Sequence, residues 1–149
     1  MPRVCVLTGC ASGIGRKLAS DLLSRGYLVL ATDVNEQALI SQAKERGWTG
    51  RNVALRKLDV RNKEDWEDAL SLAENTWGPI DIVMNVAGVL KPGYVHEIQT
   101  DEIDFHLDVN TKGTILGTRA AAARMIPKRS GHIINFGSLA SLAPVPGLA

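Results

Sequence analysis

Short apolar runs alternate along the chain with amphipathic segments, and this alternation restricts the fold more than any other feature of the sequence. We predict strands at residues 4–9, 27–33, 52–60, 80–88 and 132–138, and helices at 14–25, 35–46, 63–78 and 101–126. Several predicted strands are continuously apolar, as in a parallel sheet that helices cover on both faces. The sequence therefore predicts one α/β domain over residues 1–149, built on a doubly wound parallel sheet.

Composition and charge are those of an ordinary globular domain. Of the 149 residues, 45% are hydrophobic and 22% are charged, so the chain can bury a core. The formal net charge of +1 gives no electrostatic reason to expect a nucleic-acid or membrane partner. No apolar stretch reaches the roughly 18 residues of a membrane span, and no signal-peptide pattern opens the chain. We therefore expect a cytoplasmic protein.

The two cysteines do not indicate a metal site. Cys5 lies in the first predicted strand, and Cys10 lies in the glycine-rich turn that follows it. One such pair without further ligand residues is a weak metal signal, so we expect a core cysteine, a loop cysteine and no metal.

Small, polar or acidic residues stand at the carboxyl end of every predicted strand. In a doubly wound sheet these ends meet at one edge, where ligands bind. We therefore predict the functional site at this edge. The residues in question are Thr8-Gly9, Asp33, Asp59-Val60, Asn85 to Gly88, and Ser138.

The first of these turns, TGCASGIG at residues 8–15, has the composition of a phosphate-binding turn. Gly9, Gly13 and Gly15 stand between a strand and a helix. Glycines permit a tight turn and let a pyrophosphate approach the main chain, and the helix start offers free N–H groups. The alternative is a strand-to-helix connection that binds nothing.

Two aspartates follow the second and third strands. Asp33 can accept hydrogen bonds from both ribose hydroxyls of an adenosine and would repel a 2′-phosphate, which favours NAD over NADP. The alternative is an aspartate that starts a turn. Asp59 can accept from an adenine amino group, with Val60 as an apolar wall, although an aspartate there also suits the N-cap of the next helix.

Together these segments resemble the short-chain dehydrogenase/reductase family, which has a Rossmann-like fold. The resemblance implies that Ser12 and Ile14 meet the pyrophosphate, Asp33 the ribose, and Asp59 and Val60 the adenine. NVAG at 85–88 resembles the family's NNAG, with Val86 in place of the second asparagine, so that Asn85, Ala87 and Gly88 would line the cofactor channel. The segments that carry the resemblance are TGCASGIG, Asp33, Asp59-Val60, NVAG and the INFGS that ends in Ser138.

The resemblance also assigns two catalytic residues. DVNTKGT at 108–114 resembles the segment that carries the family's asparagine, so Asn110 would hold a water in a proton relay. Its spacing with Ile103, Leu107 and Thr114 predicts an inward-facing helical stripe, and the alternative is a structural amide. Ser138 would hydrogen-bond the substrate oxygen whose charge changes during hydride transfer.

The family's tyrosine, with a lysine four residues later, has no counterpart here. Ala31 stands four residues after Tyr27, and Ile98 four residues after Tyr94. The family tyrosine would fall beyond residue 149, so we expect the N-terminal part of a single domain of roughly 250 residues. The sheet would be incomplete after the fifth strand, and the chain alone would be marginally stable or self-associating, without turnover.

The leading hypothesis is an NAD-dependent oxidoreductase that interconverts a small alcohol and a carbonyl compound by hydride transfer. Two alternatives stay open. One is a non-catalytic dinucleotide-binding module or regulator, and the other is a methyltransferase, because an acid after the second strand can also bind an adenosyl ribose. By resemblance, the long fourth helix is a candidate surface for pairing with a second copy.

Overall fold

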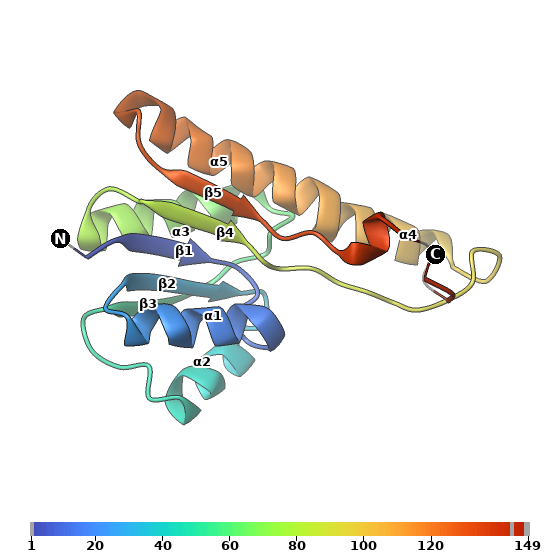
Figure 1. The fold of residues 1–149 in the computed structure, drawn as a ribbon, viewed down its shortest axis with the longest axis horizontal. Coiled ribbons are helices and arrows are strands. Elements are labelled where there is room, and N and C mark those ends of the chain that lie inside the picture. Colours follow the sequence, from blue (N-terminus) through green and yellow to red (C-terminus); the bar gives the residue numbers. More distant parts are fainter. Residues whose placement is uncertain (1, 144, 148–149) are drawn as a thin grey trace.

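Five parallel strands form one sheet in the computed structural model, which describes residues 2–143 and 145–147. The strands are β1 (Val4–Leu7), β2 (Leu28–Asp33), β3 (Val53–Lys57), β4 (Ile82–Asn85) and β5 (His132–Asn135). Their order is β3-β2-β1-β4-β5, so the chain first winds outward to β3 and then crosses to the other side of β1 (Figure 1). This topology confirms the predicted doubly wound sheet.

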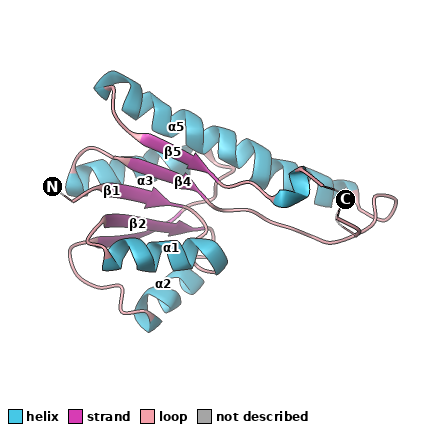
Figure 2. Ribbon diagram, in the orientation of Figure 1, coloured by secondary structure: helices cyan, strands magenta, loops and turns pink. Residues whose placement is uncertain are grey.

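Helices cover both faces of the sheet (Figure 2). α1 (Gly13–Ser24) and α2 (Glu36–Glu45) pack on one face, whereas α3 (Lys63–Trp77) and α5 (Gly113–Lys128) pack on the other. α4 (Thr100–His106) continues into α5 through a π-helical segment, η1 (Leu107–Lys112), and a short 3-10 turn, η2 (Leu139–Ser141), follows β5. Figure 1 shows α4 extending past the carboxyl edge of the sheet.

The alternation of side chains in β1 explains why this strand is apolar throughout. Val4 and Val6 point into the core cluster beneath α3 and α5. Cys5 and Leu7 point into the cluster beneath α1 and α2. All four are buried, because each face of the strand meets a helix layer.

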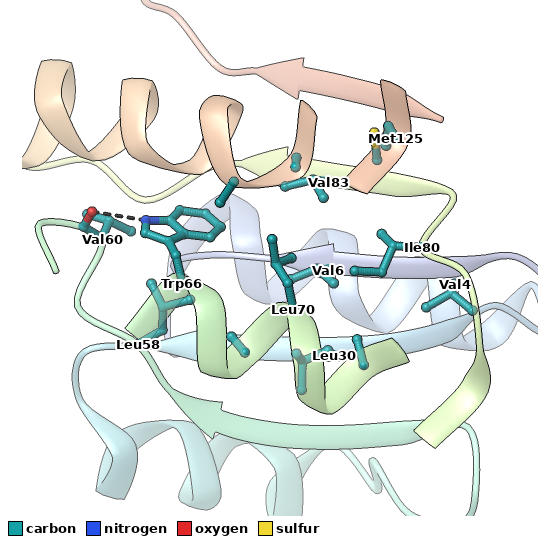
Figure 3. Packing of buried hydrophobic residues seen from close by; sticks show 14 of the residues in the cluster. Val4, Val6, Leu30, Leu58, Val60, Trp66, Leu70, Ile80, Val83 and Met125 are labelled. Carbon is teal, nitrogen blue, oxygen red and sulfur yellow. Dashed lines mark hydrogen bonds between the residues drawn. The ribbon is translucent and has the colours of Figure 1, made fainter. Parts of the chain in front are cut away.

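Trp66 of α3 is the largest fully buried side chain and connects the core to the functional edge (Figure 3). Its Nε1 donates a hydrogen bond of 3.0 Å to the carbonyl oxygen of Val60. A buried indole N–H needs such a partner, and this one fixes the turn after β3. α5 passes close to the ring at Gly117, where a Cβ atom would lie 2.5 Å from Trp66 Cζ2.

The second strand ends at Asp33 as predicted, but the other four predicted strands extend too far at their carboxyl ends, because the chain leaves the sheet there to form the functional edge. The fifth strand differs most from the prediction of a buried strand. β5 pairs only with β4 in the described structure, so His132 and Asn135 are exposed and Phe136 is 41% exposed. β3, at the opposite edge, has the mixed composition expected of an outer strand.

Candidate functional site

A cavity of about 520 Å³ lies at the carboxyl ends of the strands. Its walls come from the glycine-rich turn, the ends of β2, β3 and β4, and the α4–η1 helix, so distant segments meet at one place. The sequence-predicted cofactor residues line it, with the exception of Asn85. The lining residues are Gly9, Ser12, Gly13, Ile14, Gly15, Asp33, Val34, Leu58, Asp59, Val60, Arg61, Val86, Ala87, Gly88, Val89, Phe105 and Val109.

The glycine-rich turn depends on its glycines for two different reasons. Gly9 has a φ of +71°, and a Cβ atom there would lie 3.0 Å from Ala87 Cα. Gly13 has a φ of +51° with open space around it. Gly15 is helical, but its Cβ would overlap the carbonyl group of Gly9. Gly9 is therefore required by its left-handed backbone and its close approach to Ala87, whereas Gly15 is required because α1 packs directly against the carbonyl group of Gly9.

The start of α1 faces the cavity with free hydrogen-bonding capacity. Ser12 is the N-cap residue, and its side chain makes no capping hydrogen bond. No acidic residue occupies the first turn of α1. A helix start with unsatisfied N–H groups and an uncompensated positive dipole end is suited to bind an anion such as a pyrophosphate.

Asp33 holds its carboxylate at the cavity through two backbone donors. Oδ2 accepts from the N–H of Ala11 at 2.9 Å, and Oδ1 accepts from the N–H of Asn35 at 2.9 Å. The bond to Asn35 is the turn contact foreseen as the alternative role of this residue. Each oxygen keeps further acceptor capacity, so the turn contact leaves the carboxylate able to bind a ligand.

Asp59 forms an ion pair with Arg61 rather than capping α3. Arg61 Nε donates to Oδ1 at 2.9 Å, and Nη2 donates to Oδ2 at 2.6 Å. These hydrogen bonds hold the pKa of the Asp59 carboxyl below its usual value. The predicted alternative, an N-cap at Asp59, is wrong, because Asn62 accepts the N–H groups of Glu64 and Asp65 instead.

Several lining residues had no sequence prediction, and two of them, Arg61 and Phe105, contact each other. Arg61 Cζ lies 5.6 Å from the centre of the Phe105 ring. The only local signal was the placement of Arg61 two residues after a strand-end aspartate. Phe105 gave none, because its approach depends on how α4 crosses the cavity.

Thr8 fixes the segment that follows β4. Its Oγ1 accepts hydrogen bonds from the N–H groups of Val86 and Ala87, each at 3.0 Å. Asn85 itself is buried against α5 and does not line the cavity. Its Nδ2 donates to Asn135 Oδ1 at 2.7 Å, and its Oδ1 has no partner among the described residues.

The structure does not place the two predicted catalytic residues in the lining of the cavity. The Asn110 side chain forms a pair of hydrogen bonds with the main chain of Val89: Oδ1 accepts from N–H at 2.8 Å, and Nδ2 donates to the carbonyl oxygen at 2.9 Å. Ser138 Oγ accepts from the N–H of Ala140 at 3.1 Å and caps η2.

The predicted inward-facing stripe around Asn110 is wrong. Ile103 is 46% exposed and Leu107 is 56% exposed, whereas Val109 and Gly113 are buried. The buried positions lie one residue earlier than predicted, and the mismatch begins at Ile103 in α4, before the π-helical segment η1. Asn110 consequently points to Val89, a neighbour on the cavity wall.

The cysteines and the possible metal ligands form no second functional site among the described residues. Both cysteines are buried, and burial raises the pKa of each thiol to about 12. Cys10 is therefore a core residue, although it lies in a turn. Within residues 2–143 and 145–147, no group of three or more metal-ligand side chains comes together, and no helix is long and apolar enough to span a membrane.

Comparison with known sequences gives a consistent set of relatives. A sequence model of the family described as short chain dehydrogenase matches residues 3–149. A 2,3-dihydro-2,3-dihydroxybenzoate dehydrogenase of Bacillus subtilis (strain 168) is 33% identical over 147 residues, which are 99% of this chain and 56% of the relative. An uncharacterized oxidoreductase of Staphylococcus aureus (strain USA300) is 36% identical over 137 residues, 92% of this chain and 58% of that protein. The chain thus spans little more than half the length of these relatives.

Solved structures give the same result. A serine dehydrogenase from Escherichia coli superposes with a TM-score of 0.87 at 31% identity. The match covers 97% of this chain and 66% of the serine dehydrogenase chain. A short-chain dehydrogenase/reductase from Burkholderia phymatum, in complex with NAD, reaches a TM-score of 0.92 at 29% identity, over 99% of this chain and 53% of its own. With its sheet order, its glycine-rich turn and a family match over nearly its whole length, the chain belongs to the short-chain dehydrogenase family.

Proposed function

We propose that the cavity binds NAD(H), and that the chain forms the cofactor-binding part of an oxidoreductase acting on a small alcohol or carbonyl compound. The observation that carries the proposal is the Asp33 carboxylate, which two backbone N–H groups hold at the cavity. The related Burkholderia phymatum enzyme, whose structure contains NAD, supports a nicotinamide dinucleotide as the ligand.

The residues present fit such a ligand at three points. The helix start at Ser12 and the crowded glycines leave main-chain N–H groups for a pyrophosphate. Asp33 offers acceptors for two ribose hydroxyls, and its negative charge opposes a 2′-phosphate. Asp59 and Val60 supply an acceptor and an apolar wall for the base. The preference for NAD over NADP follows from the charge at Asp33.

A bound nicotinamide dinucleotide would supply hydride transfer to or from a carbonyl carbon. In this proposal the Ser138 hydroxyl, which accepts from the N–H of Ala140 and still has its own proton to donate, would bind the reacting oxygen. Asn110 bonds the main chain of Val89 through both of its side-chain atoms and would hold a water of the proton relay through its remaining hydrogen-bonding capacity. A tyrosine with its ordinary pKa of about 10 transfers protons poorly near neutral pH, unless a nearby lysine lowers that pKa. Neither Tyr27 nor Tyr94 has a lysine four residues later, so we propose that residues 1–149 bind the cofactor without turning over substrate.

Titration with NADH and with NADPH tests the cofactor assignment, with ligand fluorescence as the readout. We expect NADH to bind at least about tenfold more tightly, because like charges about 4 Å apart cost roughly 1–4 kcal/mol at the cavity surface. Asp33→Ala should weaken NADH binding and reduce the ratio of NADH affinity to NADPH affinity. Asp21→Ala, which removes an exposed aspartate from α1, is the matched control and should change neither.

Three results would contradict parts of the proposal. Equal affinities for NADH and NADPH in the unmodified chain would remove the role of Asp33. Binding of S-adenosylmethionine in place of either dinucleotide would favour the methyltransferase alternative. Binding of NADH by the full-length protein with no turnover of any alcohol or carbonyl compound would favour the non-catalytic module.

We also propose that the helix formed by α4, η1 and α5 pairs with a second copy. Its outer surface exposes Ile103, Leu107, Ile115 and Ile126, the last at 72%. Isolated exposed apolar residues are common, but a row along one long helix is typical of an interface. Light scattering after size exclusion should give a mass above that of the 16.1 kDa monomer, and a monomer at micromolar concentration would contradict the pairing.

A further inference from the structure

Arg61 connects two walls of the cavity that come from distant parts of the chain. Its guanidinium forks onto both carboxylate oxygens of Asp59, in the turn after β3. The same group lies over the ring of Phe105 in α4, 5.6 Å from its centre. All three side chains line the cavity, and the Arg61 side chain is 39% exposed, so the contact lies at the rim of the cavity.

This arrangement fixes the Asp59 carboxylate in one orientation. A bidentate guanidinium pair sets the plane of the carboxylate, and stacking on an aromatic ring limits rotation of the guanidinium. The main chain of Asp59 is fixed as well, because its N–H donates to Asp65 Oδ2 at 2.8 Å. The pKa of Asp59 is lowered by its hydrogen bonds with Arg61, so near neutral pH the group can only accept hydrogen bonds.

Only an arginine can make both contacts. A lysine ammonium is a point charge that cannot fork onto two oxygens in one plane, and it stacks less well on a ring. The chain provides a second arginine–aspartate pair for comparison, Arg56 with Asp68, which joins β3 to α3 outside the cavity through a contact of 3.2 Å. Arg61 differs from Arg56 in three ways: it makes a bidentate contact with its aspartate, it lies over an aromatic ring, and it lines the cavity.

We propose that Arg61 is a positioning residue that makes the base end of the cavity selective for a 6-aminopurine. It holds the Asp59 carboxylate where that group accepts a hydrogen bond from the amino group, and it links the carboxylate to α4 through Phe105. A 6-oxopurine would instead present acceptor lone pairs to the carboxylate, which has no proton to donate. This inference rests on the proposed function, because it concerns the base of the proposed dinucleotide.

The test compares NADH with reduced nicotinamide hypoxanthine dinucleotide, which differs only at the 6-position of the purine. We expect the unmodified chain to bind NADH about tenfold more tightly, since the oxo group leaves the acceptor unpaired. Arg61→Leu should reduce this ratio to below about threefold, and Arg61→Lys should not restore it. Arg56→Leu, the matched control, should leave the ratio unchanged.

The ratio of NADH to NADPH affinity separates a local effect from general damage to the fold. That ratio depends on Asp33, so it should stay the same in Arg61→Leu if only the base end has changed. Phe105→Leu provides a second variant should Arg61→Leu fail to fold. It keeps the ion pair and removes the stacking, so the purine ratio should fall by a smaller factor.

The outcomes distinguish this inference from the proposed function. If the unmodified chain binds both dinucleotides equally, or if both variants keep the full purine ratio, Arg61 does not position Asp59 for base selection, whereas the NAD(H) proposal stands. If neither dinucleotide binds to the unmodified chain, the proposed function fails, and the inference fails with it.

Discussion

Substitution of Gly15 by alanine tests whether the glycine-rich turn is held by packing or by local conformation. Gly15 lies in the first turn of α1 with helical geometry, so its backbone alone would accept alanine. A Cβ atom at this position would nevertheless overlap the Gly9 carbonyl group and lie 2.9 Å from the carbonyl oxygen of Thr8. These are backbone atoms, which cannot rotate away.

The expected effect is the difference between two opposing contributions. Overpacking lowers the free energy of unfolding by about 1–3 kcal/mol. We expect a loss of about 3 kcal/mol here, because the backbone atoms around Gly15 are rigid. Alanine regains about 1 kcal/mol in helix propensity. We therefore expect Gly15→Ala to lower the free energy of unfolding by about 2 kcal/mol, which for a chain of this size lowers Tm by about 4–8 °C.

Gly13→Ala is the matched control within the same turn. Gly13 has a φ of +51°, but no atom would lie within 4 Å of an added Cβ. Only the left-handed conformation opposes alanine there, at about 1 kcal/mol, which lowers Tm by about 2–4 °C.

Urea unfolding followed by far-UV circular dichroism measures both variants. If local conformation decided the outcome, Gly15→Ala would raise the free energy of unfolding, and Gly13→Ala would be the less stable of the two variants. That order of stabilities would refute the packing explanation, as would a Gly15→Ala variant that melts at or above the temperature of the unmodified chain.

Three further variants probe the parts of the fold that support the site. Gly117→Ala would push a methyl group against the buried Trp66 ring and should cost about 2 kcal/mol in urea unfolding, whereas an unchanged midpoint would mean that α5 can shift. Asn62→Ala removes the cap of α3 and should cost about 1 kcal/mol by the same measurement; no loss would show that the cap is dispensable. Arg61 lowers the folded-state pKa of Asp59, so this stabilisation is present above the unfolded value of about 3.9 and is lost as pH falls through the folded value. Asp59→Asn should therefore be less stable than the unmodified chain at about pH 6 and approach it at about pH 3, and a constant difference across that range would contradict the assignment.

The sequence was sufficient to predict most of the cavity lining. Glycines at Gly9, Gly13 and Gly15 and an acid at Asp33 follow strands that are apolar enough to be recognised without a structure. Because parallel strands bring their carboxyl ends to one edge, residues far apart in sequence could be assigned to one place. Asp59 and Val60 were placed in the same way.

Two of the errors have a common cause, since both depended on the orientation of a side chain on its element rather than on the existence of the element. Asn85 was assigned to the cavity from its position at a strand end, but its side chain is buried against α5. The stripe around Asn110 was assigned an inward face on α-helical spacing, but the buried positions of this helix are Val109 and Gly113. Residues near a strand end or a helix irregularity are the ones whose facing direction a periodic pattern does not determine.

The order of apolar runs and turns by itself determined the parallel sheet, the place of the glycine-rich turn and the acid at Asp33, because these follow from local periodicity and from the handedness of the connections. Only the tertiary structure decided that Arg61 lies between Asp59 and Phe105, that Gly15 fits against Gly9, and that Asn110 binds Val89. These contacts join elements whose spacing depends on how side chains fill the core between them. A local pattern in the sequence does not determine that spacing.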